Sequence, residues 1–154
     1  MHWGLSAARR AKTLWAVALL VPAVVAGACG GSGGGGQVSK AEWTGAHSAA
    51  VASVNQELAL ATQTLNVGDR AGILAACGLL VGDVPAARKG LPVPNAAADA
   101  ALRTGLDAAA TAGADCLHGA QVATSASLNE KAMRELASAT SLMAAANQAL
   151  AAWQ

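Results

Sequence analysis

Apolar residues recur every three or four positions in four stretches of this chain, and polar residues separate them. Such spacing places the apolar side chains on one face of an α-helix. The pattern predicts an all-α fold, a small antiparallel four-helix up-and-down bundle over residues 38–154. The four faces comprise Trp43, His47, Val51, Val54, Leu58, Ala61 and Leu65; Ile73, Leu74, Cys77, Leu80, Val81 and Val84; Leu102, Leu106, Ala109, Gly113 and Cys116 or Leu117; and Leu128, Ala132, Leu136, Ala139, Met143, Ala146, Leu150 and Trp153.

Local signals predict the limits of the first two helices. Ser39 and Glu42 have the spacing of a capping box, so the first helix should begin there and end at Gly68. Asp69 can cap the second helix. Pro85 is expected to end or kink it, because proline lacks the N–H group that a helix interior uses.

The third and fourth helices carry similar signals. The segment GLPVP over 90–94 predicts a break in extended conformation, after which Asn95 caps the third helix. His118 and Gly119 should close that helix. Ser127 and Glu130 form a second capping-box pattern, which predicts the start of the fourth helix.

The composition agrees with a helical fold. Alanine, the strongest helix former, is the commonest residue, Phe and Tyr are absent, and four Trp supply the aromatic side chains. Faces made of small residues let helices approach each other closely. We therefore expect little room for an internal ligand cavity.

The charged residues exclude several functions. Ten Lys and Arg stand against nine Asp and Glu without forming a basic stripe, so we expect no nucleic-acid partner. Asp107 and Asp115 should lie about 12 Å apart along one helix, too far for a coupled acid/base pair. No CxxC, HExxH or clustered His and Cys spacing marks a metal site. We therefore expect no enzyme activity, no cofactor and no metal.

The first 36 residues have a different pattern. A basic segment, ARRAK, precedes sixteen residues without charge, TLWAVALLVPAVVAGA, which lead into Cys29 and a glycine run. This order is typical of a secretory signal peptide. The residues Ala26-Gly27-Ala28-Cys29 resemble the lipobox of bacterial lipoproteins, with Ala26 where Leu or Val is usual. The resemblance implies that residues 1–28 are removed as a lipoprotein signal peptide and that Cys29 receives a diacylglycerol with fatty acyl chains such as palmitate. Cys29 would then anchor the chain to the extracytoplasmic face of the cell membrane.

Two other fates of the N-terminus stay open. Ala26-Gly27-Ala28 also fits the A-x-A pattern of ordinary signal peptidase, which would cut the same bond and release the protein. An uncleaved membrane anchor is the second alternative. It normally needs about 20 apolar residues, and Pro22 interrupts this run.

The lipobox resemblance also bears on the other cysteines. Residues 29–37 would be the lipidated cysteine and a Gly-rich tether. If lipid occupies Cys29, Cys77 and Cys116 remain to pair with each other. Their disulfide would close a loop of about 40 residues and contribute roughly 4 kcal/mol. Two separate buried thiols are the alternative.

Three residues are candidates for ligand binding: His47, His118 and Trp43. His47 follows Trp43 by one turn on the same apolar face, and His118 lies where a cation meets the negative end of a helix. A packed or capping role is favoured for both histidines. If the bundle brought them together, haem or a transition metal would be conceivable. Trp43 and Trp153 should lie at the same end of the bundle, either in the core or as an aromatic anchor for a membrane or a partner.

These observations predict a membrane-anchored envelope lipoprotein whose helical domain binds or interacts without catalysis. Its expected partners are the membrane, through the lipid on Cys29, and a protein of the envelope. A carrier of a small ligand, haem among them, is the alternative. A secreted helical protein cleaved by ordinary signal peptidase is a further one.

Overall fold

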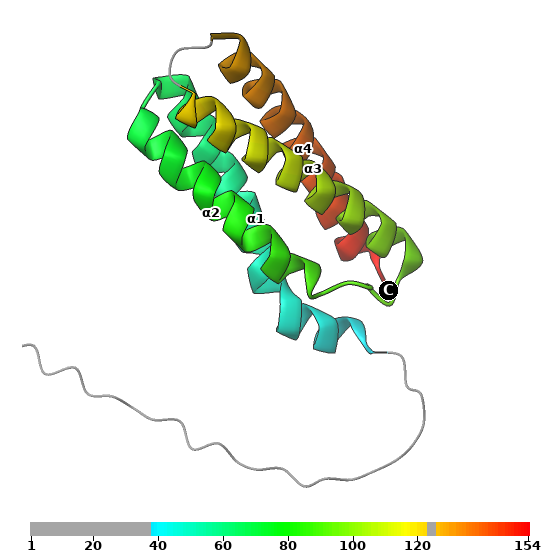
Figure 1. The fold of residues 1–154 in the computed structure, drawn as a ribbon. Coiled ribbons are helices and arrows are strands. Elements are labelled where there is room, and N and C mark those ends of the chain that lie inside the picture. Colours follow the sequence, from blue (N-terminus) through cyan, green and yellow to red (C-terminus); the bar gives the residue numbers. More distant parts are fainter. Residues whose placement is uncertain (1–37, 123–125) are drawn as a thin grey trace, which may run out of the picture. The chain divides into compact units, whose positions relative to one another are not determined.

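The computed structural model describes residues 38–122 and 126–154, which contain four α-helices (Figure 1). They are α1 (Lys40–Val67), α2 (Arg70–Arg88), α3 (Ala96–Gln121) and α4 (Ala126–Ala152). Each helix packs against the next, and α4 returns beside α1. The prediction of an all-α antiparallel four-helix bundle is confirmed. The predicted signal peptide, Cys29 and the tether lie outside the described residues.

Side-chain caps explain where the first three helices begin. The Ser39 hydroxyl accepts a hydrogen bond from the Glu42 N–H, and the Glu42 carboxylate accepts one from the Ser39 N–H at 2.8 Å. The side chains of Asp69 and Asn95 accept hydrogen bonds from main-chain N–H groups in the first turns of α2 and α3. Gly68 ends α1 at a φ of 73°, a left-handed conformation that glycine adopts without strain.

Of the two effects predicted for Pro85, an end or a kink of α2, the first is wrong. The helix continues to Arg88. Pro85 is exposed and lies in the last turn, where its missing N–H removes a single main-chain hydrogen bond near an end that is already open.

Two limits around residues 119–127 also differ from the prediction. The helix α3 extends past Gly119 to Gln121, and Arg70 donates hydrogen bonds to the Ala120 and Gln121 carbonyls there. These bonds satisfy carbonyls that the helix end would leave free. The helix α4 begins at Ala126, so Ser127 lies inside the helix and not at its cap.

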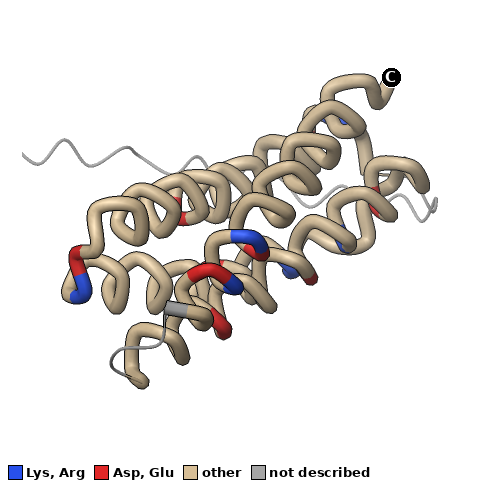
Figure 2. The backbone as a smooth tube through the Cα atoms, turned by 90° about the horizontal axis from the view of Figure 1, so that it is seen from above, with Lys and Arg blue, Asp and Glu red and all other residues tan. Residues whose placement is uncertain are grey.

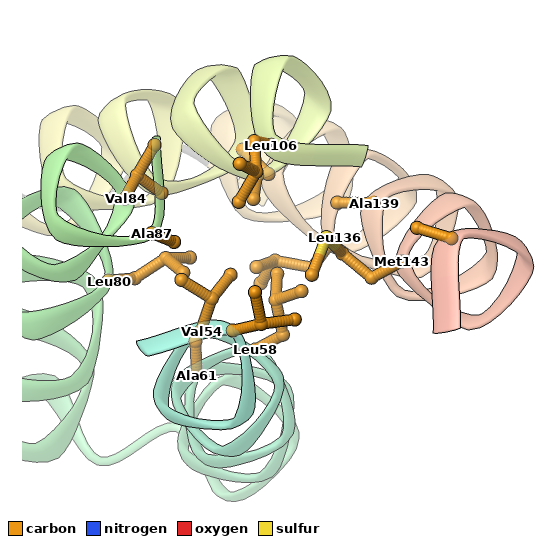
Figure 3. Close-up of a cluster of buried hydrophobic side chains, with 14 of the residues drawn as sticks. Val54, Leu58, Ala61, Leu80, Val84, Ala87, Leu106, Leu136, Ala139 and Met143 are labelled. Carbon is orange, nitrogen blue, oxygen red and sulfur yellow. The ribbon is translucent and has the colours of Figure 1, made fainter. Parts of the chain in front are cut away.

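The predicted apolar faces meet in the core. Figure 3 shows Val54 and Leu58 of α1 pointing toward Leu80 of α2, Leu106 of α3 and Leu136 of α4. All five side chains are fully buried. The helices α3 and α4 approach closely at Gly105, where an added Cβ would lie 2.8 Å from the Met143 sulfur. The expected close contact of small faces is confirmed at this pair.

Val81 was predicted in the core and is an exception. Its side chain is 38% exposed, whereas Leu80 is fully buried. Neighbouring residues of a helix point about 100° apart, so with Leu80 directed at the centre of the core Val81 falls at the edge of the buried face. It lies at the edge between α2 and α3, near Gly113.

A disulfide joins α2 to α3. It links Cys77 and Cys116, whose Cα atoms are 5.9 Å apart, and both side chains are buried. The predicted pairing is confirmed, and the alternative of two separate thiols is wrong.

The helix α2 is unusually apolar for its length. Among the described residues, it is the helix with the length and apolar composition of a membrane span. A core helix of a bundle has the same composition, and α2 supplies Cys77 and Leu80 to the core. Its composition therefore carries no conclusion about a membrane.

Candidate functional site

Two tryptophans meet at the end of the bundle where α1 begins and α4 ends. The ring centroids of Trp43 and Trp153 are 6.1 Å apart, and the rings meet edge to face. The Trp43 indole N–H also donates a hydrogen bond of 2.6 Å to the Gly90 carbonyl. Both side chains are more than nine-tenths buried. Their predicted proximity is confirmed, and their burial places them in the core.

Lys40 closes the same end of the bundle. Its ammonium donates hydrogen bonds to the carbonyls of Ala151 and Trp153, at 3.0 Å and 2.5 Å. These carbonyls belong to the C-terminus of α4, where a cation is favoured by the helix dipole. Lys40 therefore ties the first turn of α1 to the last turn of α4.

The two histidines occupy different environments. The His47 ring lies 5.5 Å from the Trp43 ring, and a Cβ added at Gly90 would lie 3.0 Å from the His47 side chain. His47 is thus packed between Trp43 and the segment after α2. His118 is exposed in the last turns of α3.

The bundle does not bring the histidines together. The helices α1 and α3 run in the same direction, and His47 lies near the start of one whereas His118 lies near the end of the other. The rise per residue puts them about 20 Å apart along the bundle. This geometry offers no shared site for haem or a metal between His47 and His118. Among residues 38–122 and 126–154, no group of three or more His, Cys, Asp or Glu is placed to hold a metal ion.

A groove of about 270 Å³ opens between α1 and α4 beside Lys40. We name it the α1/α4 groove. It is lined by Lys40, Trp43, Thr44, Ser48, Val51, Ala52 and Asn55 of α1 and by Asn147, Leu150 and Ala151 of α4. The groove is open to solvent, so it is not the internal cavity for which little room was expected. It forms because α1 and α4 pack less closely than α3 and α4 do at Gly105.

A second, wider hollow of about 630 Å³ lies further along the same two helices. Its lining has no charged residue and consists of Ala59, Thr62, Gln63, Asn66, Val67, Ala137 and Thr140. The charged positions of the protein are few (Figure 2), and those of α4 all fall within residues 130–135. The linings of the α1/α4 groove and of this hollow are therefore neutral apart from Lys40.

Charged groups meet on the other side of α4. Lys131 donates a hydrogen bond of 2.8 Å to Asp115 of α3 and lies 3.5 Å from Glu135. The Lys131 ammonium lowers the pKa of Asp115. Burial, followed by the neighbouring Asp115 carboxyl, raises the pKa of Glu135, whose Oε2 has no hydrogen-bond partner. The sequence did not suggest this contact between two carboxyls.

The raised pKa of Glu135 predicts a pH-dependent stability. Ionisation of Glu135 opposes folding as the pH rises through its folded pKa. At pH 7 we expect Glu135→Gln to raise the free energy of unfolding by less than about 1 kcal/mol, since the group is partly exposed. As the pH falls well below the ordinary Glu pKa of about 4.3, to about pH 3, the difference should vanish, because Glu135 is then protonated in both states. Thermal unfolding at both pH values measures this, and Glu130→Gln, on the exposed face of α4, is the matched control. A destabilised Glu135→Gln protein at pH 7 would contradict the expectation.

Comparison with known proteins adds no functional assignment. No family model matches the chain, and the searches of curated proteins and of solved structures found no match.

Of the residues that line the α1/α4 groove, Trp43 was predicted from the sequence as a candidate for ligand binding, and the others were not. On α1 the uncharged polar residues of the groove are Thr44, Ser48 and Asn55, which recur at helical spacing beside the apolar face of that helix. This polar stripe could have been recognised in the sequence. The separation of α1 and α4 could not, because it depends on packing between the first and last helices of the bundle.

Proposed function

We propose that this protein is an envelope lipoprotein, anchored through acylated Cys29, whose helical domain binds a partner or ligand without catalysis. The observation that carries the proposal is the Cys77–Cys116 disulfide. Structural disulfides persist in exported proteins and are rare where thiols are kept reduced. The bond also uses two of the three cysteines and leaves Cys29, in its lipobox, as the single cysteine to explain.

The contacts of the bundle fit a binding domain better than an enzyme. Asp115 and Glu135 are held together by Lys131 on the side of α4 that faces α3, away from the α1/α4 groove. Neither histidine lines that groove. Apart from the Lys40 ammonium, which is hydrogen-bonded to two main-chain carbonyls, its walls offer hydroxyl, amide and apolar groups, which bind but do not transfer protons at neutral pH.

Substitution of Cys29 tests the anchor. Cys29→Ser should abolish labelling of the protein by a palmitate analogue in growing cells and should move it from the membrane to the soluble fraction, or leave an unprocessed precursor. Ser32→Ala, in the same glycine run, is the control and should behave as the wild type. Labelling, mass of the processed chain and cell fractionation are the measurements.

Each alternative fate gives another result. Ordinary secretion predicts a wild-type protein that is cut before Cys29, carries no label and is released. If the N-terminal segment is an uncleaved anchor, the wild type and Cys29→Ser should both remain in the membrane with the mass of the precursor. Either result refutes acylation of Cys29.

A further inference from the structure

The floor of the α1/α4 groove reaches the core of the bundle. Trp43 and Val51 line the groove, although each is only 4% exposed. Leu150 of α4 forms the opposite wall and is half-buried. Trp43 and Val51 therefore form a closed floor, and the apolar surface that a ligand would cover comes from Leu150 and from the methyl groups of the exposed Thr44, Ala52 and Ala151. Burial of such surface is the main source of binding energy for apolar ligands.

The groove is long and narrow. Its lining runs from Lys40 to Asn55 on α1, a length of about 22 Å at the rise of an α-helix. One acyl chain of a membrane leaflet spans about 15 Å, half of the hydrocarbon core. If a volume of about 270 Å³ extends over this length, the mean cross-section of the groove is much smaller than that of an α-helix, whose diameter is about 10 Å. The dimensions favour a single extended alkyl chain.

The α1/α4 groove has a positive charge at one end, that of the Lys40 ammonium. Lys40 is its sole charged lining residue, and no carboxylate lines it. Lys40 uses two N–H groups on the carbonyls of Ala151 and Trp153, and an ammonium has three. The third donor can bind an anionic head group, while the neutral remainder of the groove accommodates the chain.

We propose that the α1/α4 groove binds a long-chain fatty acid, with its carboxylate at Lys40 and its alkyl chain over Trp43 and Val51. This names a ligand class for the binding domain proposed above, and it rests on that proposal only for its setting in the envelope. The wider hollow beside Ala59 and Thr140 lies further along the same two helices.

Direct binding to the delipidated full chain carrying Cys29→Ser tests the proposal independently of acylation. In equilibrium dialysis with radiolabelled palmitate, we expect saturable binding of one molecule per chain. Shortening the fatty acid should weaken binding by about two- to fourfold for each CH2 group, the effect of burying a methylene partly or fully. Absence of saturable binding, or no dependence on chain length, overturns the proposal.

A blocking variant locates the site. Ala52→Trp fills the groove from an exposed position of α1, so the fold should persist, and it should weaken palmitate binding at least about tenfold. Ala114→Trp adds the same side chain on the exposed face of α3 and should bind as the parent does. Circular dichroism and thermal unfolding verify both folds. Equal binding by the two variants overturns the assignment.

The head group is tested by removing the charge. Lys40→Met should weaken binding of palmitate about tenfold, since it removes a charge-assisted hydrogen bond. Binding of hexadecanol, which has no charge, should stay unchanged and show that the groove is intact. Equal losses for both ligands, or no loss for palmitate, would refute the placement of the carboxylate at Lys40.

Discussion

Replacement of both Cys77 and Cys116 by alanine is expected to lower the free energy of unfolding by about 4 kcal/mol. The disulfide joins residues 39 positions apart. It keeps the two ends of a long loop together in the unfolded chain, a loop that contains more than half of α2 and most of α3. Alanine is the proper replacement at these buried sites, because a serine hydroxyl would need a hydrogen-bond partner there. Urea unfolding followed by circular dichroism gives the free energy.

Reduction provides the control for this prediction. A reductant should destabilise the wild-type chain by a similar amount and should leave the double alanine variant unchanged, because that variant has no bond to break. A loss below about 1 kcal/mol in the variant would mean that the unfolded chain gains little freedom from the missing link. A loss of about 4 kcal/mol in the free energy of unfolding would mean that much of the stability depends on the disulfide. Such a bond persists in an oxidising compartment, in agreement with the proposed envelope location.

Local sequence patterns predicted the elements of the fold well. The capping residues Ser39, Asp69 and Asn95 act within their own turns, and Gly68 needs only its own φ, so each is readable without knowledge of the partner helix. The end of α3 was misplaced because Arg70, fifty positions away from Ala120, supplies its carbonyl partners. Contacts of that kind are set by tertiary packing.

The candidate site was harder to predict for the same reason. Trp43 and Trp153 could be paired from topology alone, since an even number of antiparallel helices brings the two chain ends of the bundle together. The contact of Asp115 with Glu135 depends on the register of α3 against α4. The α1/α4 groove depends on the distance between two helices that no short loop connects, and no local pattern encodes that distance.

The largest single-residue effect should come from Trp43. Trp43→Ala removes a side chain that is 4% exposed and contacts both His47 and Trp153, so we expect a loss of about 3 to 5 kcal/mol in the free energy of unfolding. Urea unfolding at equilibrium measures the loss. A cost below about 1 kcal/mol would contradict the central position of this side chain in the packing at the Lys40 end.

Phenylalanine separates the packing of Trp43 from its hydrogen bond. Trp43→Phe keeps an aromatic ring but leaves the Gly90 carbonyl without its buried donor, a cost of about 1 to 3 kcal/mol beyond the lost ring atoms. Trp153→Phe is the matched control, because it trims the other ring of the same pair without touching that bond. If the two phenylalanine variants unfold at the same urea concentration, the hydrogen bond to Gly90 contributes nothing and packing alone holds the segment after α2 against α1. If Trp43→Phe is the less stable variant, as we expect, the indole N–H fixes that segment over His47 and beside the end of the bundle where the α1/α4 groove opens.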